Sequence, residues 1–196
     1  MTDLTLALIL FLLPLAYSPG PGNLFFAAYG ARFGLRATLP ANVGYHAATW
    51  AVTLAIGLGF AEIGARAPLA LSVMAWVGAG YVLWLAWGLW HAGAAEEARA
   101  QRAGFGSGAL LLLLNPKAYL IIVLMFTQFT APETGAWVVV WIASVFTLNN
   151  LLAFTLWSLA GARIGARLRQ GAAAQMANRG LALMLASVAL WMALAR

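Results

Sequence analysis

The chain has 196 residues and no cysteine, and 64% of its residues are hydrophobic while only 8% are charged. An average soluble domain is about 45–50% apolar and about 25% charged, so this chain has too few polar residues to coat a soluble surface. The composition excludes disulfides and thiolate metal sites and argues against a soluble enzyme. It favours an all-α integral membrane protein with one domain over residues 1–196.

The net charge of +6 does not indicate nucleic-acid binding. The basic residues are almost all arginines between apolar runs, without a basic block interleaved with aromatic residues. Their expected partner is the anionic cytoplasmic face of a lipid bilayer. No basic residue precedes the first apolar run, so this run is predicted to be a retained membrane segment and not a signal peptide.

Six stretches are long and apolar enough to span a membrane, for which about 20 residues are needed. They cover residues 4–31, 38–61, 69–91, 108–129, 136–160 and 180–195. The sequence therefore predicts a transporter domain with six transmembrane helices. The two long connections, residues 92–107 and 161–179, fit either amphipathic surface segments or plain solvated loops.

Arginines in the connections predict the orientation, because cytoplasmic loops carry an excess of positive charge. Eight lie in the odd-numbered connections: Arg32, Arg36, Arg99, Arg102, Arg163, Arg167, Arg169 and Arg179. Two, Arg66 and Arg196, lie on the other side. We therefore expect the odd-numbered connections to face the cytoplasm and both termini to face the periplasm.

Two helix-breaking sequences occupy corresponding positions in the two halves of the chain. Ser-Pro-Gly-Pro-Gly-Asn at residues 18–23 interrupts the first span, and Asn-Pro-Lys at residues 115–117 interrupts the fourth. Proline removes a backbone donor and disrupts the preceding turn, and freed backbone groups in a membrane need protein or water as partners. Three spans on each side of residues 92–107 predict a 3+3 inverted repeat, in which paired broken helices indicate a transporter binding site. A tolerated kink is the alternative at each position.

Lys117 is predicted to lie about 15 Å into the fourth span, near the membrane midplane. An ionisable group at this depth is costly and indicates function, whereas snorkelling to an interface is the structural alternative. All five acidic residues lie at span ends or in loops: Asp3, Glu62, Glu96, Glu97 and Glu133. Lys117 is therefore either uncharged at rest or paired with a counter-ion from outside the chain, such as a substrate carboxylate. The lack of deep carboxylates argues against a transporter of hard cations.

Two polar stripes are predicted on the second and fifth spans. The first comprises Asn42, His46, Thr49 and Thr53, and the second comprises Ser144, Thr147 and Asn150, with Asn149 beside it. Steps of three and four residues place each stripe on one helical face. The stripes either line one cavity or hydrogen-bond between helices. For His46, proton or substrate handling and a packed neutral imidazole both stay open.

Three motifs, in order, resemble those of the LysE/RhtB family of bacterial amino-acid exporters. Residues 18–23 are similar to the family's Pro-Gly-Pro-Asn element, and Gly-Ala-Gly-Tyr-Val-Leu-Trp-Leu-Ala-Trp at residues 78–87 is similar to its third-span signature. Phe105, Gly108, Asn-Pro-Lys-Ala at residues 115–118 and Gln-Phe at residues 128–129 fall where its fourth-span motif places them. The resemblance covers nearly the whole chain. It implies an exporter of amino acids or their derivatives in the bacterial inner membrane, driven by the proton gradient, with no cofactor.

The leading hypothesis is therefore a multi-pass secondary transporter that exports an amino acid or a derivative by proton antiport, with both termini in the periplasm. The predicted substrate-binding residues are Pro19, Gly20, Pro21, Gly22, Asn23, Asn42, Thr49, Asn115, Pro116, Lys117, Thr147, Asn149 and Asn150. The coupling proton is assigned to Lys117 or His46, and no metal site or catalytic residue is predicted. Gly57, Gly59 and Gly78 allow close contacts within or between protomers, so a homo-oligomer stays open.

Three other functions are alternatives to export. A non-transporting membrane scaffold or accessory subunit would tolerate neutral substitution of Lys117. A cation exporter of related topology would need the deep carboxylates that the spans lack. An intramembrane enzyme has no support from catalytic motifs, because Gly-x-Ser-x-Gly and His-Glu-x-x-His are both absent from the sequence.

Overall fold

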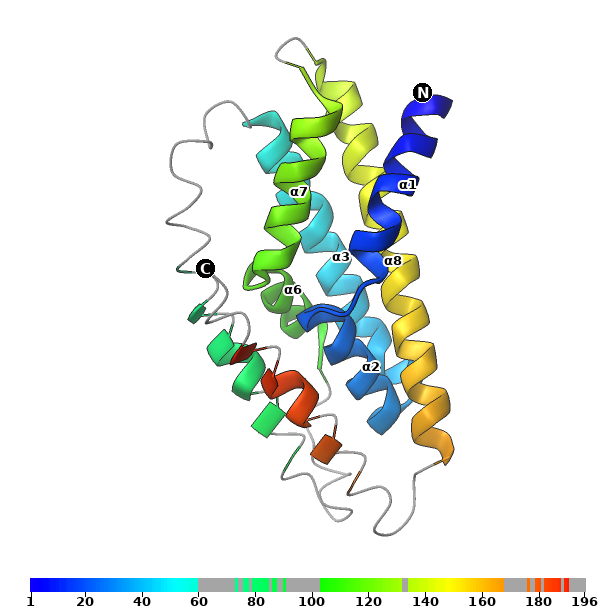
Figure 1. Ribbon diagram of the computed structural model, residues 1–196, viewed down its shortest axis with the longest axis vertical. Coiled ribbons are helices and arrows are strands. Elements are labelled where there is room, and N and C mark those ends of the chain that lie inside the picture. Colours follow the sequence, from blue (N-terminus) through cyan, green and yellow to red (C-terminus); the bar gives the residue numbers. More distant parts are fainter. Residues whose placement is uncertain are drawn as a thin grey trace.

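All secondary structure in the described part of the computed structural model is α-helical (Figure 1). The structure describes residues 1–59, 103–131 and 134–167 without a gap, together with short helical pieces between residues 73 and 90 and between residues 176 and 190. Much of the predicted third and sixth spans, residues 69–91 and 180–195, lies outside the described residues. The continuous described segments therefore correspond to the predicted first, second, fourth and fifth spans.

The predicted first span consists of two helices. α1 covers Thr2–Tyr17 and α2 covers Pro21–Phe33, and the pair is bent by 62°. Ser18 and Gly20 have extended backbones, and Pro21 opens α2, where its missing N–H would have had no partner within the helix. The Pro-Gly-Pro sequence thus ends one helix and starts the next, in agreement with the predicted interruption.

The predicted fourth span is broken in a similar way. α6 covers Phe105–Leu113 and α7 covers Pro116–Phe129, with a bend of 63°. Asn115 caps α7, because its side-chain oxygen accepts a hydrogen bond from the backbone N–H of Lys117 at 3.2 Å. Both interruptions that the sequence predicts are therefore present.

A long helix follows each bent pair. α3 covers Leu35–Leu58 and α8 covers Ala136–Arg167. α8 continues past residue 160, where the sequence predicts its end, so the first part of the connection 161–179 is helical. In Figure 1, α8 starts at the end of the molecule that holds the N-terminus and ends beside α2 at the opposite end.

By length and composition, one helix among the described residues can cross a membrane alone. It is the stretch Ala136–Ala166, which has 31 residues. The number rises to three if each bent pair forms one span. α3 has 24 residues, but its polar side chains lower its hydropathy. The order of a bent pair followed by a long helix occurs twice, whereas the six spans and the 3+3 repeat stay predictions.

Glycines allow helices from the two halves of the chain to touch at their backbones. A Cβ added to Gly161 or Gly165 of α8 would collide with backbone oxygens of α2. A Cβ added to Gly44 of α3 or Gly108 of α6 would collide with a backbone oxygen of the other helix in that pair. Small residues favour such close packing in membranes, where hydrophobicity does not drive helices together. These contacts fix α2 against α8 and α3 against α6.

Candidate functional site

The two helix breaks lie against each other and are joined by Lys117. Its Nζ donates hydrogen bonds to the backbone oxygens of Ser18 at 3.0 Å and Pro19 at 3.4 Å, and to Ser18 Oγ at 2.9 Å. Lys117 lies in the first turn of α7, whereas Ser18 and Pro19 lie between α1 and α2. One ammonium group therefore connects two broken segments that are 99 residues apart in the chain.

Backbone oxygens at the end of α1 receive the ammonium group of Lys117. This end of a helix carries a partial negative charge, which favours a cation. Among the described residues the only carboxylate side chain is that of Asp3, at the other end of α1 and about 22 Å away along the helix. The sequence alone predicts that Lys117 is either uncharged or paired with an external counter-ion. The structure adds a third arrangement, in which a helix end accepts the ammonium group.

The two preceding backbone oxygens at the first break also have side-chain donors. Asn23 reaches back from α2, and its Nδ2 donates to the backbone oxygen of Ala16 at 2.9 Å. Trp157 of α8 donates from its Nε1 to the backbone oxygen of Tyr17 at 3.2 Å. An unpaired carbonyl inside a membrane costs several kcal/mol, so these donors stabilise the interrupted conformation.

Asn115 fixes the second break to the protein core. Its Oδ1 caps α7, and its Nδ2 donates a hydrogen bond to Tyr45 Oη of α3 at 2.8 Å. Asn115 is 4% exposed and Tyr45 is 1% exposed, so neither group relies on water for this bond. Asn115, two residues before Lys117, is thus held in one orientation by its hydrogen bonds to α7 and α3.

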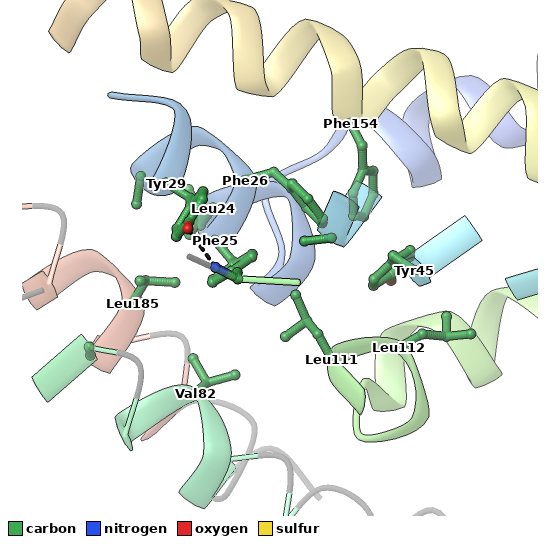
Figure 2. Close-up of a cluster of buried hydrophobic side chains, with 14 of the residues drawn as sticks. Leu24, Phe25, Phe26, Tyr29, Tyr45, Val82, Leu111, Leu112, Phe154 and Leu185 are labelled. Carbon is green, nitrogen blue, oxygen red and sulfur yellow. Dashed lines mark hydrogen bonds between the residues drawn. The ribbon is translucent and has the colours of Figure 1, made fainter. Parts of the chain in front are cut away.

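Aromatic rings from three helices pack next to the breaks, within the buried cluster shown in Figure 2. The ring of Phe154 lies 5.3 Å from that of Phe26 and 4.7 Å from that of Tyr45, measured between centroids. A Cβ added to Gly22 would approach the Phe154 ring to 2.7 Å and Tyr45 Oη to 3.3 Å. The start of α2 is therefore packed directly against these rings.

His46 connects the two predicted polar stripes. Its Nδ1 lies 2.8 Å from the backbone oxygen of Asn42, and its Nε2 lies 3.4 Å from Asn150 Nδ2. A carbonyl only accepts, so Nδ1 carries the proton and Nε2 accepts from the amide of Asn150. His46 and Asn150 are both buried, with 5% and 6% exposure. The imidazole thus bridges α3 and α8 in its neutral form.

The predicted site residues form two groups in the structure. The group at the paired breaks comprises Pro19, Gly20, Pro21, Gly22, Asn23, Asn115, Pro116 and Lys117. The second group comprises Asn42, His46 and Asn150.

The other predicted residues of the polar stripes make no hydrogen bond to these two groups within the described part of the chain. The Thr49 hydroxyl donates to the Tyr45 backbone oxygen of its own helix at 2.8 Å. Asn149 follows Asn150 directly and therefore points about 100° away around α8. Three predicted stripe residues each have a buried atom without a hydrogen-bond partner in the described part of the chain: Asn42 Oδ1, Thr147 Oγ1 and Asn149 Nδ2.

Two residues at the breaks are missed by sequence reasoning as site residues. Ser18 supplies two of the three oxygens bound to Lys117, and Trp157 supplies a donor to the end of α1. The signal for Trp157 is its spacing of seven residues from Asn150, which places both on one face of α8. Ser18 is part of the first interrupting motif, but its hydroxyl gave no separate signal.

Comparison with known proteins identifies relatives among membrane and efflux proteins. The model of the family described as LysE type translocator matches residues 13–196. The chain is 28% identical over 173 residues to an uncharacterized membrane protein of Vibrio cholerae, covering 84% of this chain and 83% of that protein. It is 31% identical over 153 residues to a cysteine/O-acetylserine efflux protein of Salmonella typhimurium, covering 74% and 76%. It is 29% identical to the protein of that name in Escherichia coli K12, with the same coverage. No solved structure matches the chain.

Proposed function

The chain belongs to the LysE type translocator family, and from this membership and the paired helix breaks we propose that it exports an amino acid or a derivative across the bacterial inner membrane by proton antiport. Relatives of this chain are named cysteine/O-acetylserine efflux proteins. Cysteine and O-acetylserine are therefore the first substrates to test. We further propose both termini on the periplasmic side, as the arginine distribution predicts.

One observation carries the proposal. Lys117, from the second break, binds the backbone oxygens of the first break. Discontinuous helices that meet at a repeat interface form substrate sites in secondary transporters. The arrangement offers a cation, freed carbonyl groups and two helix N-termini within one region. These groups complement the ammonium and carboxylate groups of an amino acid.

The proposed roles follow from the chemistry of each group. Lys117 binds the substrate carboxylate once it leaves the oxygens of the first break, since a charge-assisted bond of this type is among the strongest available. Asn115 and Asn23 hold the two breaks in shape. The coupling proton is carried by Lys117 or by His46, whose Nε2 is free of hydrogen in the neutral form and can accept a proton.

The experiment that tests the proposal is uptake of labelled cysteine, O-acetylserine and a panel of other amino acids into inverted membrane vesicles. We expect uptake of at least one compound to be increased by an imposed proton gradient, acidic inside. Lys117→Met should reduce this uptake by at least tenfold. Leu120→Met is the matched control, because Leu120 lies one turn along the same helix with half of its surface exposed.

The variants also assign the coupling proton. A His46→Gln variant that still exchanges substrate but no longer responds to the gradient would assign the proton to His46. An unaltered response would assign it to Lys117. Full gradient-driven uptake by Lys117→Met would contradict the proposed site, and absence of uptake for every amino acid by correctly inserted wild-type protein would contradict amino-acid export.

A further inference from the structure

We infer that the three oxygens now bound to Lys117 form the binding site for the α-ammonium group of the substrate, and that Lys117 occupies this site while substrate is absent. The inference rests on the proposed function, which supplies a zwitterionic substrate. The oxygens are the backbone oxygens of Ser18 and Pro19 and the hydroxyl of Ser18. We call them the ammonium site.

The number and kind of groups fit a primary ammonium ion. Lysine Nζ has three N–H donors and no acceptor, and the site offers three oxygens at 2.9, 3.0 and 3.4 Å. An α-ammonium group has the same three donors. Ser18 Oγ is oriented to accept, because it donates its own hydrogen to the backbone oxygen of Leu15 at 3.0 Å. The site is therefore built for a cation that donates in three directions.

The electrostatics of the site favour a cation and disfavour a carboxylate. The oxygens lie at the C-terminal end of α1, which carries the negative end of the helix dipole. All hydrogen-bonding groups that face the Lys117 ammonium in the described structure are acceptors. The carboxylate of the substrate therefore needs a different partner, and a displaced Lys117 supplies it.

The ammonium site borders the surface of the described structure. Pro19 is exposed and Lys117 is only partly buried. Gly20 keeps the space above the oxygens clear, because a Cβ there would lie 2.9 Å from Lys117 Cδ and 3.0 Å from Nζ. The lysine stem passes over this glycine, so a small amine can take the place of the lysine without moving the backbone.

Exchange between Lys117 and substrate conserves charge at the site. A zwitterion adds no net charge when it enters. Its ammonium group replaces the lysine ammonium on the oxygens of the first break, and its carboxylate, attached to the same carbon, meets the released lysine. Two ammonium groups do not share these three oxygens, because like charges at this distance repel strongly. Without substrate, Lys117 alone connects the two helix breaks. With substrate bound, the substrate lies between them, with its ammonium group on the first break and its carboxylate on Lys117.

The direct test is binding of n-propylammonium to purified full-length Lys117→Ala, since this ion replaces the part of the lysine side chain beyond Cβ. We expect a saturable rise in the midpoint of thermal unfolding, which tetramethylammonium does not produce because it has no N–H donor. Wild-type protein should show no such rise, because its own lysine fills the site. Equal effects of both ions on Lys117→Ala, or no effect of either, would overturn the inference.

A pair of serine substitutions tests the geometry. Adding Ser18→Ala to Lys117→Ala removes one of the three oxygens, and the affinity for n-propylammonium should fall about tenfold, the effect of one hydrogen bond to a charged group. Adding Ser158→Ala instead should leave the affinity unchanged. Ser158 is fully buried on α8, and its hydroxyl has no hydrogen-bond partner within the described residues. An equal loss in both double variants would contradict the site.

Inhibition of transport by the wild-type protein tests the same inference if Lys117→Ala does not fold. With the transported amino acid as labelled substrate, its unlabelled form should inhibit uptake at least tenfold more strongly than the analogue that lacks the α-amino group. For cysteine that analogue is 3-mercaptopropionate. Equal inhibition during normal transport would overturn the ammonium site and leave amino-acid export standing. Binding of n-propylammonium to Lys117→Ala without transport of any amino acid would instead overturn export, and the α-ammonium assignment with it.

Discussion

Asn115 holds the second helix break with both ends of its amide group. The oxygen caps α7 through the N–H of Lys117, and the nitrogen donates to the buried hydroxyl of Tyr45. An alanine or leucine at this position would leave a helix N-terminus uncapped and a buried hydroxyl without its donor. Asn115 therefore positions the backbone of Lys117, from which the lysine side chain extends to the first break.

Asn115→Ala should lower the free energy of unfolding by about 2 kcal/mol. About 1 kcal/mol is the usual effect of losing an N-cap, and about 1 kcal/mol is the usual effect of losing one buried hydrogen bond. The measurement is the thermal unfolding midpoint of the purified protein. Tyr45→Phe is the control, because it removes only the second bond and should show about half of the effect. An Asn115→Ala variant no less stable than Tyr45→Phe would mean that the cap adds nothing.

Two kinds of contact hold the helices of this protein together: side-chain hydrogen bonds to backbone oxygens, and direct contacts between helix backbones. At the breaks, Asn23, Trp157 and Lys117 satisfy the freed oxygens. Glycines allow the backbone of α2 to contact that of α8, and the backbone of α3 to contact that of α6. A side chain inserted at such a contact must move a backbone and not just another side chain, so its effect should be larger than that of an ordinary core substitution.

Two glycines of α6 allow this to be measured within one helix. A Cβ on Gly108 would collide with the backbone oxygen of Ala41 in α3, whereas a Cβ on Gly106 meets nothing within 4 Å. Gly106→Ala should be neutral or stabilising by up to about 1 kcal/mol, since alanine favours helix. Gly108→Ala should lower stability by about 1–3 kcal/mol, as overpacking does. Thermal unfolding of both variants under the same conditions checks the difference. Equal midpoints would contradict the close approach of α3 and α6.

The sequence predicts the broken elements well because their causes are local. The clustered prolines and glycines at residues 18–23 and the Asn-Pro-Lys at residues 115–117 indicate both interruptions without any tertiary information, whereas the single prolines Pro14 and Pro40 lie inside α1 and α3. The long apolar run of α8 is equally local, although its end is not, because the residues after 160 continue the helix to Arg167.

The partner of Lys117 could not be predicted in this way. The contact joins residues 99 positions apart, and the partners are backbone oxygens, which every sequence has. Only the fold shows which oxygens are freed near the lysine. The polar stripes show the same limit, because His46 and Asn150 meet across two helices while Asn149, the neighbour of Asn150, points elsewhere.

At the scale of the whole molecule, the two ends of α8 allow the orientation of the protein in the membrane to be tested. Its 32 residues span about 48 Å, which exceeds the hydrocarbon thickness of about 30 Å. The helix is long and apolar enough to cross a membrane alone, and we expect its two ends to emerge on opposite sides. The end near Arg163 and Arg167 carries the positive charge that favours the cytoplasm, and the start of α8 lies at the same end of the molecule as the N-terminus (Figure 1).

The absence of cysteine from the chain allows each end of α8 to be labelled separately. Gly135→Cys lies just before α8, where an added Cβ meets nothing within 4 Å, and Ile164→Cys replaces a side chain with 60% of its surface exposed. In spheroplasts, a membrane-impermeant maleimide should label Gly135→Cys at once and Ile164→Cys only after lysis, with the cysteine-free parent as the blank. The reverse pattern would place the N-terminus in the cytoplasm and contradict the predicted topology. Labelling of both positions from outside would contradict a membrane span by α8 itself. The predicted pattern would place the glycine contacts between α2 and α8 at the cytoplasmic end of the molecule, beside the end of α8.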